Sequence, residues 1–166
     1  VAAPVAIIQM GATYIYNPLL GYLVERYHSR EKSFFSLIGK ILAGIFFVGV
    51  ISSVALFFFG KLLLSLFYGA GIAKHTDLLQ PMLACAFLTG IAWFVNDLLV
   101  SLDNYRGVFV GSMLSLISAV AVMAPAQMLF GLNGPTVSAL ISNAICLIYQ
   151  SSVLGKQTQQ WFGEKR

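Results

Sequence analysis

The chain has 166 residues, of which 58% are hydrophobic and only 10% are charged. Soluble domains carry about 25% charged residues, and a chain with a mean hydropathy of +0.84 has too few charges to cover a water-exposed surface. The same composition excludes intrinsic disorder. The sequence therefore predicts a membrane protein, and its net charge of +4 fits orientation in a membrane of anionic lipids better than binding of nucleic acid.

Four long stretches of the chain contain almost no charged residue. A spanning helix needs about 20 mostly apolar residues. The last stretch, from Gly107 to Gly155, is long enough for two helices, and Gly131-Leu132-Asn133-Gly134-Pro135 within it is typical of a tight turn. We therefore expect an all-α polytopic membrane protein with five transmembrane helices, at about residues 1–24, 41–60, 78–102, 108–130 and 135–154.

The basic residues fall mainly on one side of this predicted topology. Segments 25–40, 103–107 and 156–166 lie on the same side, and they hold eight of the ten Lys and Arg residues. The positive-inside rule places these segments, and with them the C-terminus, in the cytoplasm. Residue 1 then lies outside. Because the chain begins with Val and no basic segment precedes its first span, we expect the C-terminal part of a larger protein whose N-terminal half is missing.

The connection between the first two spans has the pattern of an interfacial helix. Ser29 suits the N-cap, Glu31 suits the first turn, and residues 34–38 supply an apolar side. We therefore expect a cytoplasmic interfacial helix at about residues 29–40. Aromatic residues that fit interface anchors are Tyr14, Tyr16, Tyr22, Tyr27, Tyr68 and Trp161.

Asn96 and Asp97 interrupt the third span near its inner end. An acid inside a span costs about 2.5 kcal/mol or more on insertion scales, and it usually faces a bundle interior or a water-filled cavity. One interpretation places both residues in a substrate or ion path, together with Asn17 of the first span. The other interpretation is that Asp97 reaches headgroup water or pairs with Arg106.

Two prolines inside predicted spans, Pro18 and Pro125, are hinge candidates, because proline removes a backbone donor and can kink a helix. Proline is also common in membrane helices that do not act as hinges. Small residues in the last two spans favour close helix packing. These are Gly107, Gly111, Ser112, Ser115 and Ser118 in the fourth span, and Ser138 and Ser142 in the fifth.

The sequence contains no recognisable pattern for catalysis, metal binding or cofactor binding. Cys85 and Cys146 lie in predicted spans and are interpreted as buried apolar residues. His28 and His75 lie on opposite sides of the predicted membrane, so they cannot share a metal. No nucleophile has a base at a recognisable spacing, and no phosphate-binding loop occurs. We therefore predict no catalytic residue, no metal, no cofactor and no enzyme activity.

Four short motifs follow one another along the chain. They are Asn17-Pro18-Leu19-Leu20 before the pair Glu25-Arg26, then Leu66-Phe67-Tyr68-Gly69, Leu102-Asp103-Asn104-Tyr105-Arg106 and Gly131-Leu132-Asn133-Gly134. In order and topology they resemble the last five helices of the polysaccharide-biosynthesis flippases of the Wzx type, in the multidrug/oligosaccharidyl-lipid/polysaccharide exporter superfamily. The resemblance covers nearly the whole chain. Pro135 and Thr136 depart from it, because the family has two small residues there.

The resemblance implies a flippase that moves an oligosaccharide on a polyprenyl pyrophosphate carrier across the bacterial inner membrane, for synthesis of O-antigen, capsule or exopolysaccharide. The family works by alternating access between two helical bundles. This chain would supply most of the C-terminal bundle, and the missing N-terminal half would complete the cavity. A polysaccharide polymerase is a further candidate partner. Two alternatives stay open: a multidrug or toxin exporter of the same superfamily, and a membrane scaffold or assembly subunit that transports nothing.

Overall fold

The computed structural model describes residues 2–31, 33–68 and 79–163, and these ranges are helical apart from short turns. The all-α prediction is therefore confirmed. The helices are α1 (Ala2–His28), α2 (Ser33–Tyr68), α3 (Leu79–Ser101), α4 (Tyr105–Phe130), the short 3-10 helix η3 (Gly131–Asn133) and α5 (Gly134–Gly163).

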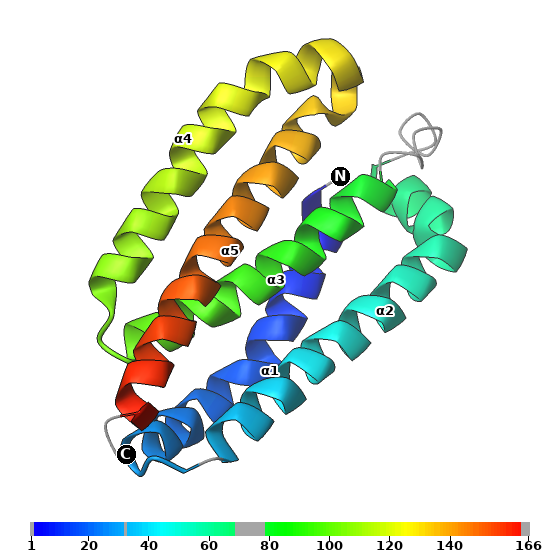
Figure 1. Cartoon of the computed structure of the whole chain (residues 1–166). Coiled ribbons are helices and arrows are strands. Elements are labelled where there is room, and N and C mark those ends of the chain that lie inside the picture. The colour runs from blue at the N-terminus through cyan, green and yellow to red at the C-terminus, as the bar shows by residue number, and fades with distance from the viewer. Residues whose placement is uncertain (1, 32, 69–78, 164–166) are drawn as a thin grey trace.

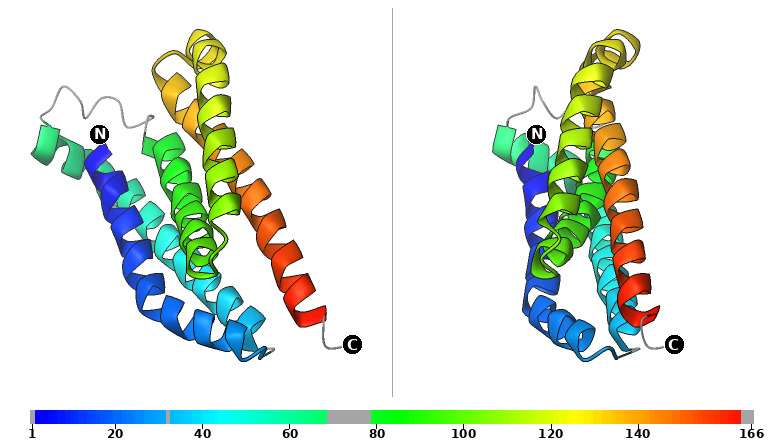
Figure 2. Two further views of the ribbon diagram at one scale, coloured as in Figure 1. Left: turned by 90° about the vertical axis from the view of Figure 1, so that its left-hand side faces the viewer. Right: turned by 60° about the vertical axis from the view of Figure 1, so that its left-hand side comes forward.

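The helices lie side by side in the order α4, α5, α3, α1 and α2, with α4 and α2 at opposite edges (Figures 1 and 2). The central helix, α3, contacts each of the other four long helices. The buried core forms where α1, α2 and α3 meet. Its members are Tyr16, Leu23, Tyr27, Phe34, Ile41, Ile45, Phe94, Val95, Leu98, Leu99 and Leu102.

Among the described residues, three segments are long and apolar enough to cross a membrane: Ser33–Ala55, Pro81–Ser101 and Tyr105–Gly163. The sequence predicts five spans. The difference has two sources. The third segment, of 59 residues, folds as two antiparallel helices, α4 and α5 (Figure 1). α1 has 27 residues but is not in this set, since polar side chains such as Asn17 lower its hydropathy.

α4 and α5 pack closely because glycines on α4 leave room for side chains of α5. A Cβ atom at Gly107 would lie 2.9 Å from Val153, and one at Gly111 would lie 2.8 Å from Gln150. Both glycines are buried. The predicted packing role of this GxxxG pair is confirmed.

The predicted turn at residues 131–135 is also confirmed. Gly131 has a φ of +54°, in the left-handed region that favours glycine. At Gly134, a Cβ atom would lie 2.6 Å from the backbone of Gln127. Just beyond the turn, the Ser138 hydroxyl donates a hydrogen bond of 2.9 Å to the carbonyl of Ala119 on α4. These contacts hold the two helices together near the turn.

The helix predicted at residues 29–40 begins at Ser33, not at Ser29, and it continues directly into the second span. The chain turns at Arg30, which has a φ of +54°, and α2 begins at Ser33 and continues without a break to Tyr68. Phe34 lies at helical spacing from the apolar residues of the following span. The sequence therefore gives no boundary between two helices here. Residues 61–68, which lie in the loop between the predicted second and third spans, are the last turns of α2, which bend away from its main axis (Figure 1). The rest of that loop, including Gly69, lies outside the described residues.

Both hinge candidates lie inside helices that continue through them, Pro18 in α1 and Pro125 in α4. Figure 2 shows that α1 curves in its second half, which contains Pro18. Both prolines are exposed. Whether either position acts as a hinge stays a prediction.

The close packing of α4 on α5 predicts the effect of adding one methyl group at Gly111. Gly111→Ala should lower the free energy of unfolding by about 1–3 kcal/mol, because the methyl group would overlap the buried Gln150 side chain. Thermal unfolding of the purified protein in detergent measures this change.

The matched control is Gly155→Ala on α5, where nothing lies within 4 Å of a new Cβ atom. This variant should be neutral or slightly stabilising, because alanine favours a helix more than glycine does. Equal effects of the two substitutions would contradict the proposed packing.

Candidate functional site

Asp97 is held between α1 and α3 by a tyrosine. The Tyr16 hydroxyl donates a hydrogen bond to Asp97 Oδ2 at 2.8 Å. Tyr16 is 1% exposed, and its ring centre lies 5.4 Å from that of Phe94. The partner of the acid is thus Tyr16 and not Arg106, which is exposed in the first turn of α4. Tyr16, predicted as an interface anchor, is instead part of the bundle core.

Asn96 points toward a different neighbour, because consecutive residues of a helix project about 100° apart. The Gln150 amide on α5 donates a hydrogen bond from Nε2 to Asn96 Oδ1 at 3.0 Å. Gln150 is 1% exposed and occupies the space that Gly111 leaves open. Its Oε1 atom is buried and has no hydrogen-bond partner among the described residues. The two adjacent polar residues of α3 therefore tie it to α1 and to α5.

The contact between Asn96 and Gln150 is one of three along α3 and α5, which run in the same direction (Figure 1). Toward the N-terminal end of α3, Asn143 Nδ2 donates to Thr89 Oγ1 at 2.8 Å. Just past the C-terminal end of α3, Asn104 Nδ2 donates to Gln157 Oε1 at 2.7 Å. We call this set of three pairs the α3–α5 ladder.

The α3–α5 ladder was not predicted from the sequence, although the spacing of polar residues in the sequence contains a signal for it. Asn143, Gln150 and Gln157 are spaced by seven residues, and so are Thr89 and Asn96. A seven-residue spacing returns a side chain to the same face of a packed helix after two turns. Two such series in two helices indicate polar faces that can pair with each other.

Contacts of Trp161 join α5 to α1 at the end of the bundle where α1 and α2 are connected. The indole Nε1 of Trp161 donates to the carbonyl of Tyr27 at 3.0 Å, and the two rings stack with centres 5.5 Å apart. The guanidinium carbon of Arg30 lies 4.4 Å from the centre of the Trp161 ring, a cation–π contact. These residues fix the end of α5 against the turn between α1 and α2.

The structure brings together only part of the predicted path. Asn96 and Asp97 lie within the bundle and are partly buried, whereas Asn17 is exposed on α1. Asn17 follows Tyr16 directly, so it projects to another side of the helix. The predicted set is therefore divided: Asp97 contacts α1 through Tyr16, Asn96 contacts α5, and Asn17 lies on an exposed side of α1.

The chain was compared with known proteins. No protein family matches it, and no match was found among curated proteins or solved structures.

The α3–α5 ladder predicts an energetic coupling between Asn96 and Gln150. In a double-mutant cycle of Asn96→Ala and Gln150→Ala, the coupling energy should be about 0.6 kcal/mol and at most about 1.7 kcal/mol, as for other hydrogen bonds within membranes. Unfolding of the four proteins in lipid micelles gives this energy.

The same cycle with Asn17→Ala in place of Asn96→Ala is the control. Because Asn17 lies on the exposed side of α1, its effect should add to that of Gln150→Ala within about 0.5 kcal/mol. A coupling energy of zero between Asn96 and Gln150 would refute the pairing.

Proposed function

We propose that this chain is a membrane-spanning bundle of a transporter that flips a lipid-linked oligosaccharide across the bacterial inner membrane. The substrate class comes from the resemblance of the four sequence motifs to Wzx-type flippases. The structural observation that carries a transport function is the carboxyl group of Asp97, which sits between two membrane helices with a tyrosine hydroxyl as its partner. Ionisable groups in such positions are expensive to insert and usually serve function.

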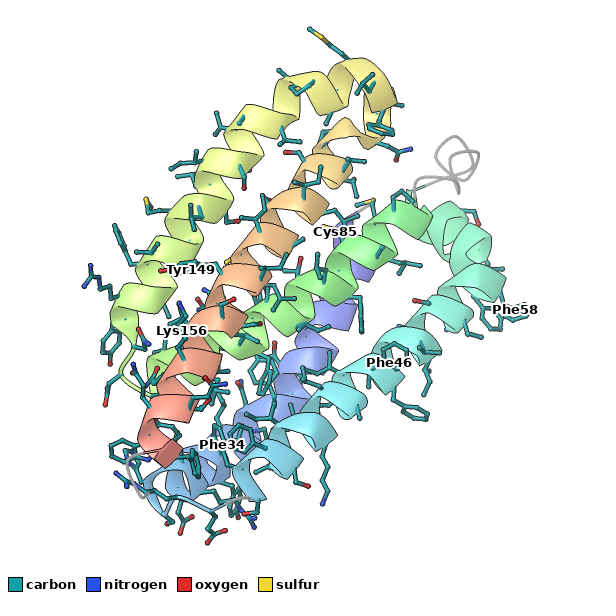
Figure 3. The ribbon with its side chains drawn as sticks, in the orientation of Figure 1. Phe34, Phe46, Phe58, Cys85, Tyr149 and Lys156 are labelled. Atoms are coloured by element: carbon teal, nitrogen blue, oxygen red, sulfur yellow. The ribbon has the colours of Figure 1, made fainter. Side chains whose placement is uncertain are left out.

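All five long helices are proposed to cross the membrane. At about 1.5 Å per residue, α1, α4 and α5 are each roughly 40 Å long or more, which exceeds a hydrocarbon core of about 30 Å. Basic residues lie at the end of the bundle where α1 and α2 are connected, and Lys156 on α5 lies toward that same end (Figure 3). This distribution supports a cytoplasmic location for that end and for the C-terminus.

The scaffold alternative makes a different use of the same polar residues. A scaffold could use the α3–α5 ladder, because neutral amide pairs specify which helices pack together. It would have no use for an ionisable group at Asp97, since an amide accepts the Tyr16 hydrogen bond equally well. Replacing only the charge at Asp97 therefore separates a transporter from a scaffold.

The test is deletion of the gene in its bacterium, followed by complementation. The deletion should strand the undecaprenyl-linked repeat unit on the cytoplasmic face and remove surface polysaccharide. The wild-type gene should restore export, whereas Asp97→Asn should reduce the rate roughly tenfold or more, because the ionisable group is lost. Surface polysaccharide and the accumulated lipid-linked unit are both measured.

The amount of Asp97→Asn protein in the membrane is the control and should equal that of the wild type. Normal surface polysaccharide in a strain that lacks the gene and any paralogue would refute the flippase proposal. If that strain instead became sensitive to toxic compounds, the exporter alternative would replace it. Full export by Asp97→Asn would remove Asp97 from the mechanism.

A further inference from the structure

One face of α1 is exposed and differs in composition from the exposed face of the neighbouring helix α2. In the part of α1 whose side chains are described, every exposed residue falls within an arc of about 140° at 100° per residue. We call this set the outer face of α1. It consists of Met10, Tyr14, Asn17, Pro18, Gly21, Tyr22, Glu25 and His28.

The exposed face of the neighbouring helix α2 is apolar. Its described exposed residues from 43 to 62 carry no hydrogen-bonding side chain, and Phe58 among them points outward (Figure 3). They are Ala43, Phe46, Phe47, Val50, Ile51, Val54, Ala55, Phe58, Phe59 and Leu62. Such a surface suits lipid tails. The outer face of α1, in contrast, presents two phenols, an amide, a carboxylate and an imidazole.

With α1 crossing the membrane as proposed, Tyr14 lies deeper than the headgroup level of an interface anchor. Tyr14 is 81% exposed and lies 13 residues from Tyr27, which marks the inner end of the bundle. At about 1.5 Å per residue this is a distance of roughly 20 Å, or two thirds of a hydrocarbon core of about 30 Å. A phenol at that depth with no protein neighbour would face hydrocarbon without a hydrogen-bond partner, which is costly. The outer face of α1 thus needs a polar neighbour.

We propose that the outer face of α1 lines a water-filled path that runs from the cytoplasmic end to the middle of the membrane and contacts the hydrophilic part of the transported molecule. Glu25 and His28 lie at its cytoplasmic end, and Asn17 and Tyr14 lie deeper. Tyrosine rings and amides suit a hydroxyl-rich solute, since they offer both apolar surface and hydrogen bonds. That the solute is a saccharide rests on the proposed function, whereas the hydration of this face rests only on the proposed crossing of the membrane by α1.

This proposal gives the polar residues of the predicted path separate roles. Asn17 meets the path, and the adjacent Tyr16 reaches back to Asp97 on α3. Two consecutive residues of α1 therefore face different surroundings: Asn17 faces the path, and Tyr16 contacts the partly buried Asp97. Asn96 takes part in the α3–α5 ladder and lies away from the path.

Cysteine accessibility in native membrane vesicles tests the proposal. The background is Cys85→Ala with Cys146→Ala, and single cysteines are placed by Tyr14→Cys or Gly21→Cys. Freeze–thaw exposes both membrane faces to an anionic, membrane-impermeant methanethiosulfonate. Because only a hydrated thiol ionises and reacts, both variants should be modified roughly tenfold faster than a lipid-facing control, or more. Gly21→Cys keeps the test available if Tyr14→Cys does not fold, since nothing lies within 4 Å of a Cβ atom at Gly21.

The matched control is Phe47→Cys on α2. Gly11 faces Val48 and Gly44 faces Ile15 across the α1–α2 contact, so Phe47 lies at nearly the same depth as Tyr14. It is 66% exposed, but on the apolar face.

Two results would overturn the proposal. If Tyr14→Cys and Gly21→Cys react as slowly as Phe47→Cys but are labelled by a membrane-permeant maleimide, the outer face of α1 contacts lipid. If neither reagent labels them before unfolding, another helix covers the face. Neither labelling result depends on transport activity. Normal surface polysaccharide in the deletion strain would therefore refute the proposed flippase function but not the hydration of the outer face of α1.

Discussion

The arrangement of this protein depends on one constraint: a polar side chain in a membrane helix must find its partner within the protein. α3 carries such side chains on two sides. Asp97 pairs with Tyr16 of α1, and Thr89 and Asn96 pair with residues of α5. These contacts place α1 and α5 on either side of α3. α2 and α4, whose exposed side chains are mostly apolar, lie at the edges of the array (Figure 1).

Close packing adds to these polar contacts where the chain has glycines. Gly107 and Gly111 bring α4 against α5, and the second of them makes room for Gln150 of the α3–α5 ladder. The close packing of α4 on α5 at Gly111 therefore also supports the buried amide of Gln150. On the other side of the array, α1 uses Tyr16 for packing and leaves Asn17 on its outer face.

Much of the fold could be predicted from the sequence, because charges and turn residues mark the ends of apolar helices. The turn around Gly131 and the extent of α3 followed from these signals. The helix predicted at residues 29–40 starts at Ser33 and is one helix with the second span, because Phe34, Ile41 and Ile45 lie at helical spacing on one buried face. The site was predicted less well than the fold. Asn17 and Asp97 are both polar residues in spans, but a rotation of about 100° per residue separates Asn17 from Tyr16, which binds the acid.

The central claim is that Tyr16 holds the Asp97 carboxyl inside the bundle. An infrared difference spectrum between the wild type and Asp97→Asn, recorded in lipid, isolates the band of this carboxyl group. The account predicts that Tyr16→Phe shifts the band, because its hydrogen bond is lost, and that Tyr22→Phe, on the exposed outer face of α1, leaves it in place. A band that Tyr16→Phe does not move would contradict the account.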